Sequence, residues 1–460
     1  MSNEFLELKL RSELATNLSE IGFNEMTPIQ AGSLPTILSG KDIVGQAKTG
    51  SGKTAAFGLG ILNSLDIKNI DTQALILCPT RELAEQVSTE LRKLARMMSN
   101  VKILTITGGV GYHHQESSLD HGAHIIVGTP GRVAKLIGSK YILLDYIKTL
   151  VLDEADRLLD MGFFDEIMGI ERQLSLDRQT MLFSATFPDE ILDLSKRIQK
   201  DAEQIIVDSQ HEEGNIEQYF YELGSHKDKN DALLKVLGKY NPARIIIFCK
   251  TKVITDNLST FLQKNNILAA SIHGDIDQND RTKILTRFSN QSLSILVATD
   301  VAARGIDIKD LDAVLNYDLP TDGEDYVHRI GRTGRAGKKG LAFSFFVAAE
   351  QYKIDQIQEL VMDNFTISSI DSVGDGLVYS ATPPMDTIFI SGGKKDKIRP
   401  GDILGALVKE ALLEPSDVGD ITILSIVAYV AIKKESSHQA ITKLSEGRIK
   451  NRHFRVGLVT

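Results

Sequence analysis

A glycine-rich loop between an expected strand and an expected helix constrains this 460-residue chain more than any other feature. Residues 42–46 read as a short strand, and an Ala- and Leu-rich helical stretch follows the loop. Between them the chain reads Ala47-Lys48-Thr49-Gly50-Ser51-Gly52-Lys53-Thr54. Glycines let backbone N–H groups approach phosphate oxygens, and the helix N-terminus adds a favourable dipole. The stretch predicts an α/β domain that binds a nucleotide, with Lys53 at the β and γ phosphates and Thr54 on Mg²⁺.

An acidic pair follows another apolar run. Residues 150–152 read as a buried strand that delivers Asp153 and Glu154 to its carboxyl end, where open α/β sheets bind ligands. One carboxylate could hold Mg²⁺, and the next could orient or deprotonate an attacking water. Taken alone, a solvated acidic turn explains the pair equally well. The loop has its own alternative, a glycine-rich turn without a ligand. One residue departs from the general pattern: Ala47 stands where that pattern has its first glycine.

Three more expected strands of the first half, residues 74–78, 101–106 and 124–127, end in small residues. Small side chains expose backbone amides, which suits contact with a sugar-phosphate backbone. Each such end alone is more often a plain turn, but three in one domain favour nucleic-acid contact. The candidate residues are Thr80, Arg81, Gly109, Thr129 and Arg132.

Two other stretches of the first half each allow two interpretations. Ser184-Ala185-Thr186 follows an apolar run and is either a capped turn or an element that couples two functions. Thr27 before Pro28 indicates a helix start. The second interpretation of that region places Phe23 on an aromatic base and Gln30 on the edge of the base.

A basic segment closes the second half of the chain. Residues 209–216 are polar and contain glycine, as linkers do, and a second alternation of strands and helices follows them. It leads to residues 326–335, where Arg329, Arg332 and Arg335 stand among glycines. A solvated helix face is the usual interpretation of such a segment. Because the first half is expected to hold a nucleotide, arginine fingers are the better interpretation. Such a finger raises the rate of phosphoryl transfer about 10³–10⁵-fold.

The pattern of apolar residues changes in the last 75 residues, which follow a linker at residues 366–385. Their expected order is β-α-β-β-α-β, the split pattern of RNA-recognition motifs. Two basic clusters accompany it: Lys394, Lys395, Lys397 and Arg399 in one, and Arg448, Lys450, Arg452 and Arg455 in the other. Phe389, Tyr429 and Phe454 are the only candidates for base stacking, and any of them could be core.

The charge is unevenly distributed. The whole chain carries −9, whereas residues 386–460 hold 12 Lys and Arg against 9 Asp and Glu, which is +3 and leaves −12 for the rest. A basic appendage on an acidic body can still bind RNA, because counterion release depends on local patches. Two distant cysteines, Cys78 and Cys249, argue against a zinc site and for a reducing cytoplasm. We expect neither a membrane span nor a secretory signal.

The predicted fold is therefore α/β. Two tandem RecA-like parallel-sheet domains are expected at residues 1–208 and 217–365, separated by the linker at 209–216. After the boundary at 366–385, a small α+β domain of RRM-like order (βαββαβ) is expected at 386–460.

Taken together, the motifs resemble those of the DEAD-box family of ATP-dependent RNA helicases, in order and spacing, over residues 5–345. Ala47 is that family's usual residue. The matching positions are Gln30, Ala47–Thr54, Pro79–Ala84, Thr129–Arg132, Asp153–Asp156, Ser184–Thr186, Ala298–Asp307 and His328–Arg335. The tail, with residues 392–395 and 399–404, resembles the C-terminal domain of one bacterial subfamily over a shorter stretch.

The resemblance implies roles for named residues. Phe5, Phe23 and Gln30 would hold adenine, Ala47 to Thr54 the phosphates, and Asp307 the ribose. Thr54 and Asp153 would bind Mg²⁺, Glu154 would be the general base, and Arg332 and Arg335 the fingers. Thr80, Arg81, Gly109, Thr129, Arg132, Thr299 and Arg304 would face RNA. Ser184, Thr186 and Asp156 would couple hydrolysis to domain closure.

The resemblance also implies an activity. We expect ATP, Mg²⁺ and RNA as ligands, and RNA-stimulated ATP hydrolysis that locally unwinds short duplexes. The tail would bind a hairpin of large-subunit ribosomal RNA beside a duplex, within a pre-ribosomal particle, and the enzyme would be a cytoplasmic monomer. A DNA translocase and a non-catalytic RNA-binding scaffold are the alternatives. For the tail, the alternative is a stability or docking module.

Overall fold

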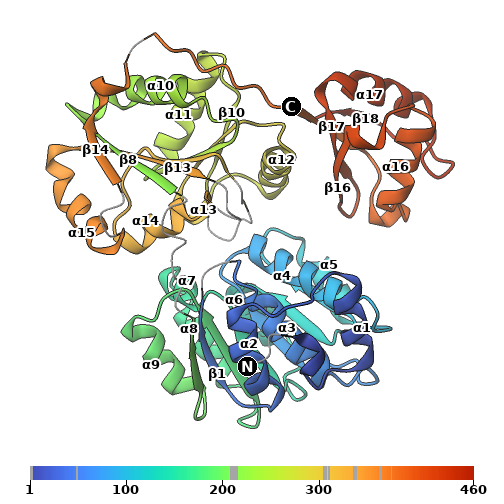
Figure 1. The fold of residues 1–460 in the computed structure, drawn as a ribbon. Coiled ribbons are helices and arrows are strands. Elements are labelled where there is room, and N and C mark those ends of the chain that lie inside the picture. The colour runs from blue at the N-terminus through green and yellow to red at the C-terminus, as the bar shows by residue number, and fades with distance from the viewer. Residues whose placement is uncertain are drawn as a thin grey trace. The chain divides into compact units, whose positions relative to one another are not determined.

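The structure is a computed structural model that describes residues 4–47, 50–207, 216–303, 308, 311–334, 339–361, 365–374 and 376–459. The chain divides near residue 211 into two compact units. Figure 1 traces both units from the N-terminus to the C-terminus.

The first unit is built on a parallel sheet that has seven strands among the described residues, in the order β3-β4-β2-β5-β6-β1-β7. The strands are β1 Ile43–Gln46, β2 Ala74–Leu77, β3 Ile103–Ile106, β4 Ile125–Gly128, β5 Thr149–Leu152, β6 Gln179–Ser184 and β7 Glu203–Ile206. The helices are η1 Phe5–Glu7, α1 Ser12–Glu20, α2 Pro28–Leu38, α3 Lys53–Ser64, α4 Arg81–Leu94, α5 Tyr112–Leu119, α6 Pro130–Gly138, α7 Ala155–Asp160, α8 Phe164–Glu171 and α9 Asp189–Ile198.

Helices cover both faces of this sheet (Figure 1). Along β5, Val151 packs with α1 to α4 on one face, and Leu150 and Leu152 pack with α6 to α9 on the other. All four residues of β5 are buried, as a strand covered on both faces requires. Because β5, β6 and β1 are neighbours and parallel, their carboxyl ends bring three motifs to one edge.

The second unit holds another parallel sheet, for which the described residues give seven strands in the order β10-β11-β9-β12-β13-β8-β14. The strands are β8 Ile216–Leu223, β9 Ile245–Phe248, β10 Ala269–Ile272, β11 Ile295–Ala298, β12 Ala313–Asn316, β13 Gly340–Val347 and β14 Phe365–Ser369. The helices are η2 His226–Asp228, α10 Lys229–Tyr240, α11 Lys252–Lys264, α12 Gln278–Ser289, α13 Asp300–Ala303, α14 Gly323–Ile330, η3 Ala348–Glu350, α15 Gln351–Val361 and η4 Ile370–Val373.

The tail, also in the second unit, forms an antiparallel sheet in the order β16-β17-β15-β18. Its elements are β15 Met385–Ile390, η5 Lys394–Asp396, α16 Pro400–Lys409, η6 Pro415–Asp417, β16 Val418–Ile423, β17 Ala428–Lys433, η7 Lys434–Ser436, α17 Ser437–Glu446 and β18 Val456–Leu458. Ile388 and Ile390 of β15 pack with both helices, so α16 and α17 cover one face of the sheet.

The predicted fold class is confirmed: two parallel α/β sheets precede a small βαββαβ domain. Four strands were not predicted, β7, β8, β13 and β14. One of them, β14, pairs with β8 and begins the stretch that we assigned to the second linker. Its residues Phe365–Ser369 lack a continuous apolar run, since the strand lies at the sheet edge and three of its five residues are exposed. Residue 208 and residues 209–215 of the first linker lie outside the described residues.

Candidate active site

The glycine-rich loop joins β1 to α3, as predicted. Gly52 has φ +96° directly before α3, and a Cβ there would lie 2.4 Å from the Gln30 side-chain nitrogen. Only glycine fits both that backbone conformation and that approach. Lys53 is buried, and its Nζ donates to the Ala47 carbonyl oxygen at 2.8 Å across the loop. Lys48 and Thr49 lie outside the described residues.

Two buried hydroxyl groups at the glycine-rich loop are placed to contact a ligand. Among the described residues, the buried hydroxyl oxygens of Thr27 and Ser51 have no hydrogen-bond partner. Buried polar groups are normally paired, so unpaired hydroxyls at a phosphate-type loop fit a ligand with many acceptor oxygens. The loop, Lys53 and these hydroxyls therefore fit the phosphates of a nucleotide.

The acidic pair lies at the end of β5. Asp153 is 3% exposed, and its Oδ1 accepts the Glu154 backbone N–H at 3.1 Å. Burial raises the pKa of Asp153 to about 7, the nearby Lys53 opposes that rise, and Glu154 adds to it. A carboxylate that is buried without a full counter-charge is costly, which fits a site built for a cation. Thr54, half-buried at the start of α3, is the other predicted Mg²⁺ ligand.

Those two residues do not form a complete metal cage. Among the described residues, no group of three or more His, Cys, Asp or Glu side chains could hold a metal ion. Mg²⁺ is commonly held by one or two protein oxygens together with phosphates and waters. The donors present therefore fit a magnesium ion that arrives with a nucleotide.

Glu154 occupies a turn of unusual conformation. Its φ of +51° and ψ of +56° lie in the left-handed region, which costs a residue with a side chain about 1–2 kcal/mol. The turn separates the two carboxylates: Asp153 ends the strand, and Glu154 precedes α7. Such strain at a strand end is typical of residues held for chemistry.

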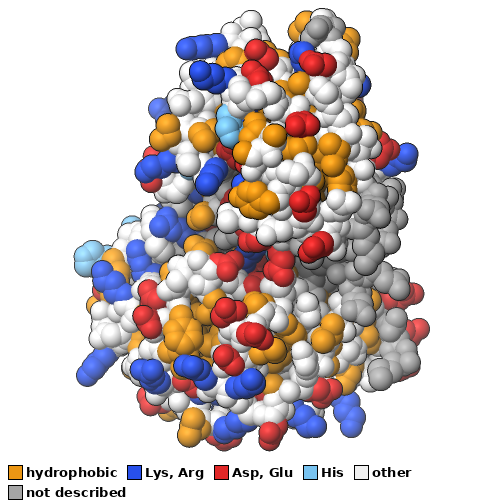
Figure 2. Space-filling view, turned by 90° about the vertical axis from the view of Figure 1, so that its left-hand side faces the viewer, with side chains coloured by type: hydrophobic (Ala, Val, Ile, Leu, Met, Phe, Trp, Pro, Cys, Tyr) orange, Lys and Arg blue, Asp and Glu red, His pale blue; other side chains and the backbone are white. Residues whose placement is uncertain are grey.

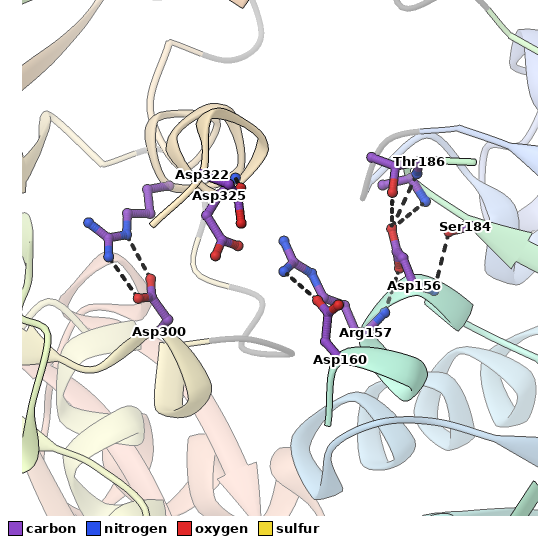
Figure 3. Close-up of polar contacts among 10 residues, drawn as sticks. Asp156, Arg157, Asp160, Ser184, Thr186, Asp300, Asp322 and Asp325 are labelled. Carbon is purple, nitrogen blue, oxygen red and sulfur yellow. Dashed lines mark hydrogen bonds and ion pairs between the residues drawn. The ribbon is translucent and has the colours of Figure 1, made fainter. Parts of the chain in front are cut away.

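Asp156 connects the acidic motif to the end of β6 (Figure 3). Its Oδ2 accepts the backbone N–H groups of Ala185 and Thr186 at 3.1 and 3.2 Å, and the Thr186 hydroxyl at 3.3 Å. Its own N–H donates to the Ser184 hydroxyl at 3.3 Å. The Ala47 N–H in turn donates to the Ser184 carbonyl at 3.0 Å. A continuous hydrogen-bond path therefore joins the phosphate loop, Ser184 and Asp156.

The predicted adenine residues lie beside α2. Phe5 is buried and its ring centroid lies 6.1 Å from that of the half-buried Phe23. Gln30 accepts the Thr27 N–H at 2.9 Å and donates to the Gly52 carbonyl at 3.1 Å. Gln30 therefore links this region directly to the phosphate loop, a contact that the sequence did not indicate.

The three predicted RNA-facing loops of the first unit meet around Gly109. This residue has φ +76°, and a Cβ on it would lie 2.1 Å from the Arg81 Nη1 atom. On the other side, Arg132 donates to the Val110 carbonyl at 3.1 Å and to the Gln115 side chain at 2.8 Å. Gln115 donates to the Thr107 carbonyl at 2.9 Å. Two arginines and a glycine turn without a side chain therefore lie close together at the ends of β2, β3 and β4.

Two threonines begin helices in the same loops. The Thr80 hydroxyl accepts the Leu83 N–H at 3.2 Å and caps α4, and Thr129 directly precedes α6. On the surface in Figure 2, Lys and Arg side chains are interspersed with Asp and Glu side chains. The face drawn in Figure 2 therefore does not carry charge of one sign.

In the second unit, Arg329 anchors the basic segment. Its guanidinium makes a two-pronged ion pair with Asp300, with both N–O distances at 2.7 Å. Asp300 is labelled in Figure 3. Arg332 follows the end of α14, which the glycine at 331 terminates, and is half-buried. Thr299 is also half-buried, at the end of β11, whereas Arg304, Asp307 and Arg335 lie outside the described residues.

Comparison with known proteins identifies the family. The DEAD/DEAH box helicase family matches residues 27–194, the helicase conserved C-terminal domain 228–337, and the DbpA RNA binding domain 387–458. Over 444 residues the chain is 46% identical to the ATP-dependent RNA helicase DbpA of Escherichia coli (strain K12), covering 96% of each chain. This protein belongs to the DEAD-box family of ATP-dependent RNA helicases.

Two further comparisons support the assignment of this DEAD-box helicase. It is 43% identical over 383 residues to the helicase CshA of Bacillus cereus (strain ATCC 10987 / NRS 248), covering 81% of this chain and 71% of that one. Its structure resembles S. cerevisiae Dbp5 bound to RNA and ADP BeF3, with a TM-score of 0.73 and 32% identity. That match covers 81% of this chain and 97% of the other. The subfamily that the tail resembles is that of DbpA.

The tail of the helicase brings its two basic clusters together. Lys450 Nζ donates to the Lys397 carbonyl at 2.8 Å, and Arg452 pairs with Asp396 at 3.5 Å. The predicted residues Lys394, Lys395, Lys397, Arg399, Arg448, Lys450 and Arg452 are all exposed. We name these seven residues the basic edge.

The sequence did not predict several residues that hold functional side chains in place. Gln115 orients Arg132, and Asn316 accepts from Arg329 at 2.9 Å. Lys229 pairs with Asp318 at 2.6 Å in the second unit. The partners lie 17, 13 and 89 positions apart in the sequence, so no local pattern pairs them. The one available signal was Asp300, an acid two positions after the end of the apolar strand β11, much as Asp153 follows β5.

Within the described residues we find no helix whose length and apolar character would let it span a bilayer.

Proposed function

We propose that this ATP-dependent RNA helicase acts on large-subunit, 23S-type ribosomal RNA during ribosome assembly. It would couple RNA-stimulated ATP hydrolysis to the local unwinding of short duplexes. The observation that carries the proposal is the basic edge on a tail that matches the DbpA RNA binding domain. The identity to E. coli DbpA over 96% of both chains supports the same substrate class.

The chemical step is assigned to residues of the first unit. Glu154, held in its left-handed turn, would take the proton of the attacking water, and Lys53 would hold the β and γ phosphates. Mg²⁺ bound at Thr54 and Asp153 would neutralise phosphate charge. Arg332 and Arg335 would complete the site from the second unit when the two units close on ATP and RNA.

The coupling step is assigned to the hydrogen-bond path through Asp156. Asp156 accepts from Thr186 and donates to Ser184, whose carbonyl accepts from Ala47 of the phosphate loop. A change of nucleotide at the loop would therefore shift the end of β6. Since ATP and RNA both favour closure, each should raise the affinity of the other by the same factor.

RNA would bind across both units through its backbone. In the first unit, Arg81, Gly109 and Arg132 lie together, with Thr80 and Thr129 at adjoining helix starts. Thr299 and Arg304 would continue the contact in the second unit. These groups suit phosphate and sugar rather than base edges, so sequence preference would come from the tail.

The test measures ATP hydrolysis with a 23S-type ribosomal RNA fragment and with a homopolymer, for the whole chain and for a chain ending at residue 385. The whole chain should prefer the ribosomal fragment, and the shortened chain should respond to both RNAs weakly and equally. If the shortened chain keeps the preference, the tail is not the specificity element. Equal stimulation by DNA would favour the DNA translocase, and no stimulation would favour the scaffold.

We propose that the helicase works in the cytoplasm as a monomer that joins a pre-ribosomal particle.

A further inference from the structure

The side chain of Tyr112 joins two helices of the first unit. Tyr112 is the first residue of α5 and is half-buried. Its hydroxyl shares a hydrogen bond of 3.0 Å with the hydroxyl of Ser139, the residue directly after α6. The same side chain packs on the core cluster to which Leu119 of α5 and Leu136 of α6 belong. The ring is therefore fixed at its backbone by α5 and at its hydroxyl by the end of α6.

Two cations of α6 lie over this ring. The guanidinium carbon of Arg132 is 5.6 Å from the ring centre, and the Lys135 Nζ atom is 5.0 Å from it. Residues three positions apart are neighbours on a helix surface, where two like charges repel each other. The electron-rich face of an aromatic ring attracts cations at this distance. Tyr112 therefore offsets the repulsion and keeps both cations beside one ring.

Arg132 is also held by polar contacts of its Nη1 atom. That atom donates to the Gln115 side chain at 2.8 Å and to the Val110 carbonyl at 3.1 Å. Gln115 is itself buried and donates to the Thr107 carbonyl at 2.9 Å. Within the part of the chain that the structure describes, the Nε and Nη2 atoms of Arg132 have no acceptor. That side of the guanidinium fork is therefore open to two phosphate oxygens.

Lys135 differs from other lysines on the helices of this unit. It is exposed, and no carboxylate of the described residues pairs with it. By contrast, the exposed Lys93 pairs with Glu90, and the exposed Lys196 pairs with Asp193. On a chain with a net charge of −9, two adjacent cations without a counter-charge fit an anionic ligand.

We propose that Tyr112 is a positioning residue that holds Arg132 and Lys135 as one phosphate-binding pair, and that Lys135 is a further contact to the RNA backbone. The inference rests on the proposed function, in which Arg132 faces RNA. Long basic side chains lose conformational freedom when they bind a phosphate. Because the ring already restricts both cations in the free protein, less of that freedom remains to be lost on binding.

The test measures the binding of a labelled single-stranded oligouridine to the full chain by fluorescence anisotropy, with ADP and beryllium fluoride present. Tyr112→Leu removes the ring but keeps an apolar side chain, and it should weaken binding about tenfold. Tyr112→Phe keeps the ring and loses only the bond to Ser139, so its affinity should stay within about twofold of the wild type. Circular dichroism checks that both variants fold.

The dependence of binding on salt tests Lys135 itself. Each phosphate contact on a single strand contributes about 0.7 to the slope of log affinity against log salt concentration. Lys135→Met should lower that slope by about this amount. Lys140→Met, at an equally exposed position after α6, is the matched control and should leave the slope unchanged. A slope unchanged by Lys135→Met would remove Lys135 as a contact, and this measurement stands even where Tyr112→Leu does not fold.

A double-mutant cycle separates positioning from a general effect on stability. Where the ring acts through the cation pair, Tyr112→Leu should cost less affinity in a Lys135→Met chain than in the wild type. Equal costs in the two backgrounds would overturn the positioning role. So would a Tyr112→Phe variant that binds as weakly as Tyr112→Leu, because the ring would then contribute nothing.

Arg132→Met distinguishes this inference from the proposed function, and it should lose affinity for the oligouridine. Such a loss, together with wild-type binding by Tyr112→Leu and Lys135→Met, would overturn only the roles of the ring and of Lys135. Wild-type binding by all three variants would instead overturn the RNA path that the proposed function draws over the first unit.

Discussion

Arg329, which is buried, and Asp300, which is half-buried, form a two-pronged ion pair at the centre of the second RecA-like sheet edge. Arg329 is 4% exposed, and its Nε and Nη2 atoms each lie 2.7 Å from an Asp300 oxygen. Its Nη1 donates to Asn316 at 2.9 Å and to the Asp318 carbonyl at 2.8 Å, and Phe248 lies beneath the guanidinium. The pair therefore ties the ends of β11 and β12 to α14, directly before Arg332.

Asp300→Ala should destabilise the second unit, because it leaves a buried guanidinium without its counter-charge. The expected loss is about 3–5 kcal/mol in the free energy of unfolding. Arg329→Lys should also lower stability, since the ammonium group of lysine cannot reproduce the planar, two-pronged contact of the guanidinium. Urea unfolding of the full chain measures both. Lys339→Ala, which breaks an exposed pair with Glu217, is the control and should cost less than about 1 kcal/mol.

Glu154→Gln should keep ATP-dependent RNA binding and abolish turnover, because glutamine preserves the shape of the turn but cannot take a proton. Fluorescence anisotropy of labelled RNA with ATP measures the first property, and phosphate release measures the second. A loss of about 10²–10⁴-fold in hydrolysis is typical for a removed general base. Near-normal hydrolysis would remove Glu154 from this role.

Gly109→Ala should weaken RNA binding selectively. The added methyl group would stand where Arg81 now approaches, in a backbone conformation that alanine resists. The RNA concentration for half-maximal ATPase stimulation should rise about tenfold, which corresponds to 1.4 kcal/mol. Gly162→Ala is the matched control, because Gly162 also has a positive φ (+79°) but nothing lies within 4 Å of an added Cβ. Equal effects of the two variants would contradict a role for the Arg81–Gly109 contact.

Asp153→Asn should change how stability depends on pH in the nucleotide-free protein. The pKa of Asp153 is raised to about 7 in the folded chain, against about 3.9 in an unfolded one. The folded state then binds the extra proton, so stability present near pH 4 is lost as the pH rises to 7. At 1.36 kcal/mol per pKa unit the loss is at most about 4 kcal/mol.

The asparagine variant lacks that ionisation, so its Tm should fall less than that of the wild type between pH 5 and pH 8. Differential scanning calorimetry without nucleotide or Mg²⁺ makes the comparison. Asp145→Asn, at an exposed position of the same unit, should follow the wild type. If the Tm of the Asp153 variant and that of the wild type depend on pH in the same way, ionisation of buried Asp153 does not cause the loss of stability.

Local signals explain why much of the site was predictable. The phosphate loop, Asp153–Glu154 and Ser184–Thr186 each follow a short apolar strand, so their sequence neighbours placed them at strand ends. Parallel sheets put strand ends on one edge, and the order of the strands then made them meet. The pattern of apolar residues could not predict strands such as β14, which is largely exposed and contains no apolar run.

The sequence by itself determined the alternation of strands and helices, the split order of the tail and the residues that carry charge, because these depend on neighbours along the chain. The tertiary structure alone decided which distant groups meet. It paired Arg329 with Asp300, set Arg81 against Gly109, and buried Thr387 beneath Asn290 and Ser292. Such contacts join residues that are remote in sequence, and their geometry follows from the packing of whole elements rather than from any local pattern.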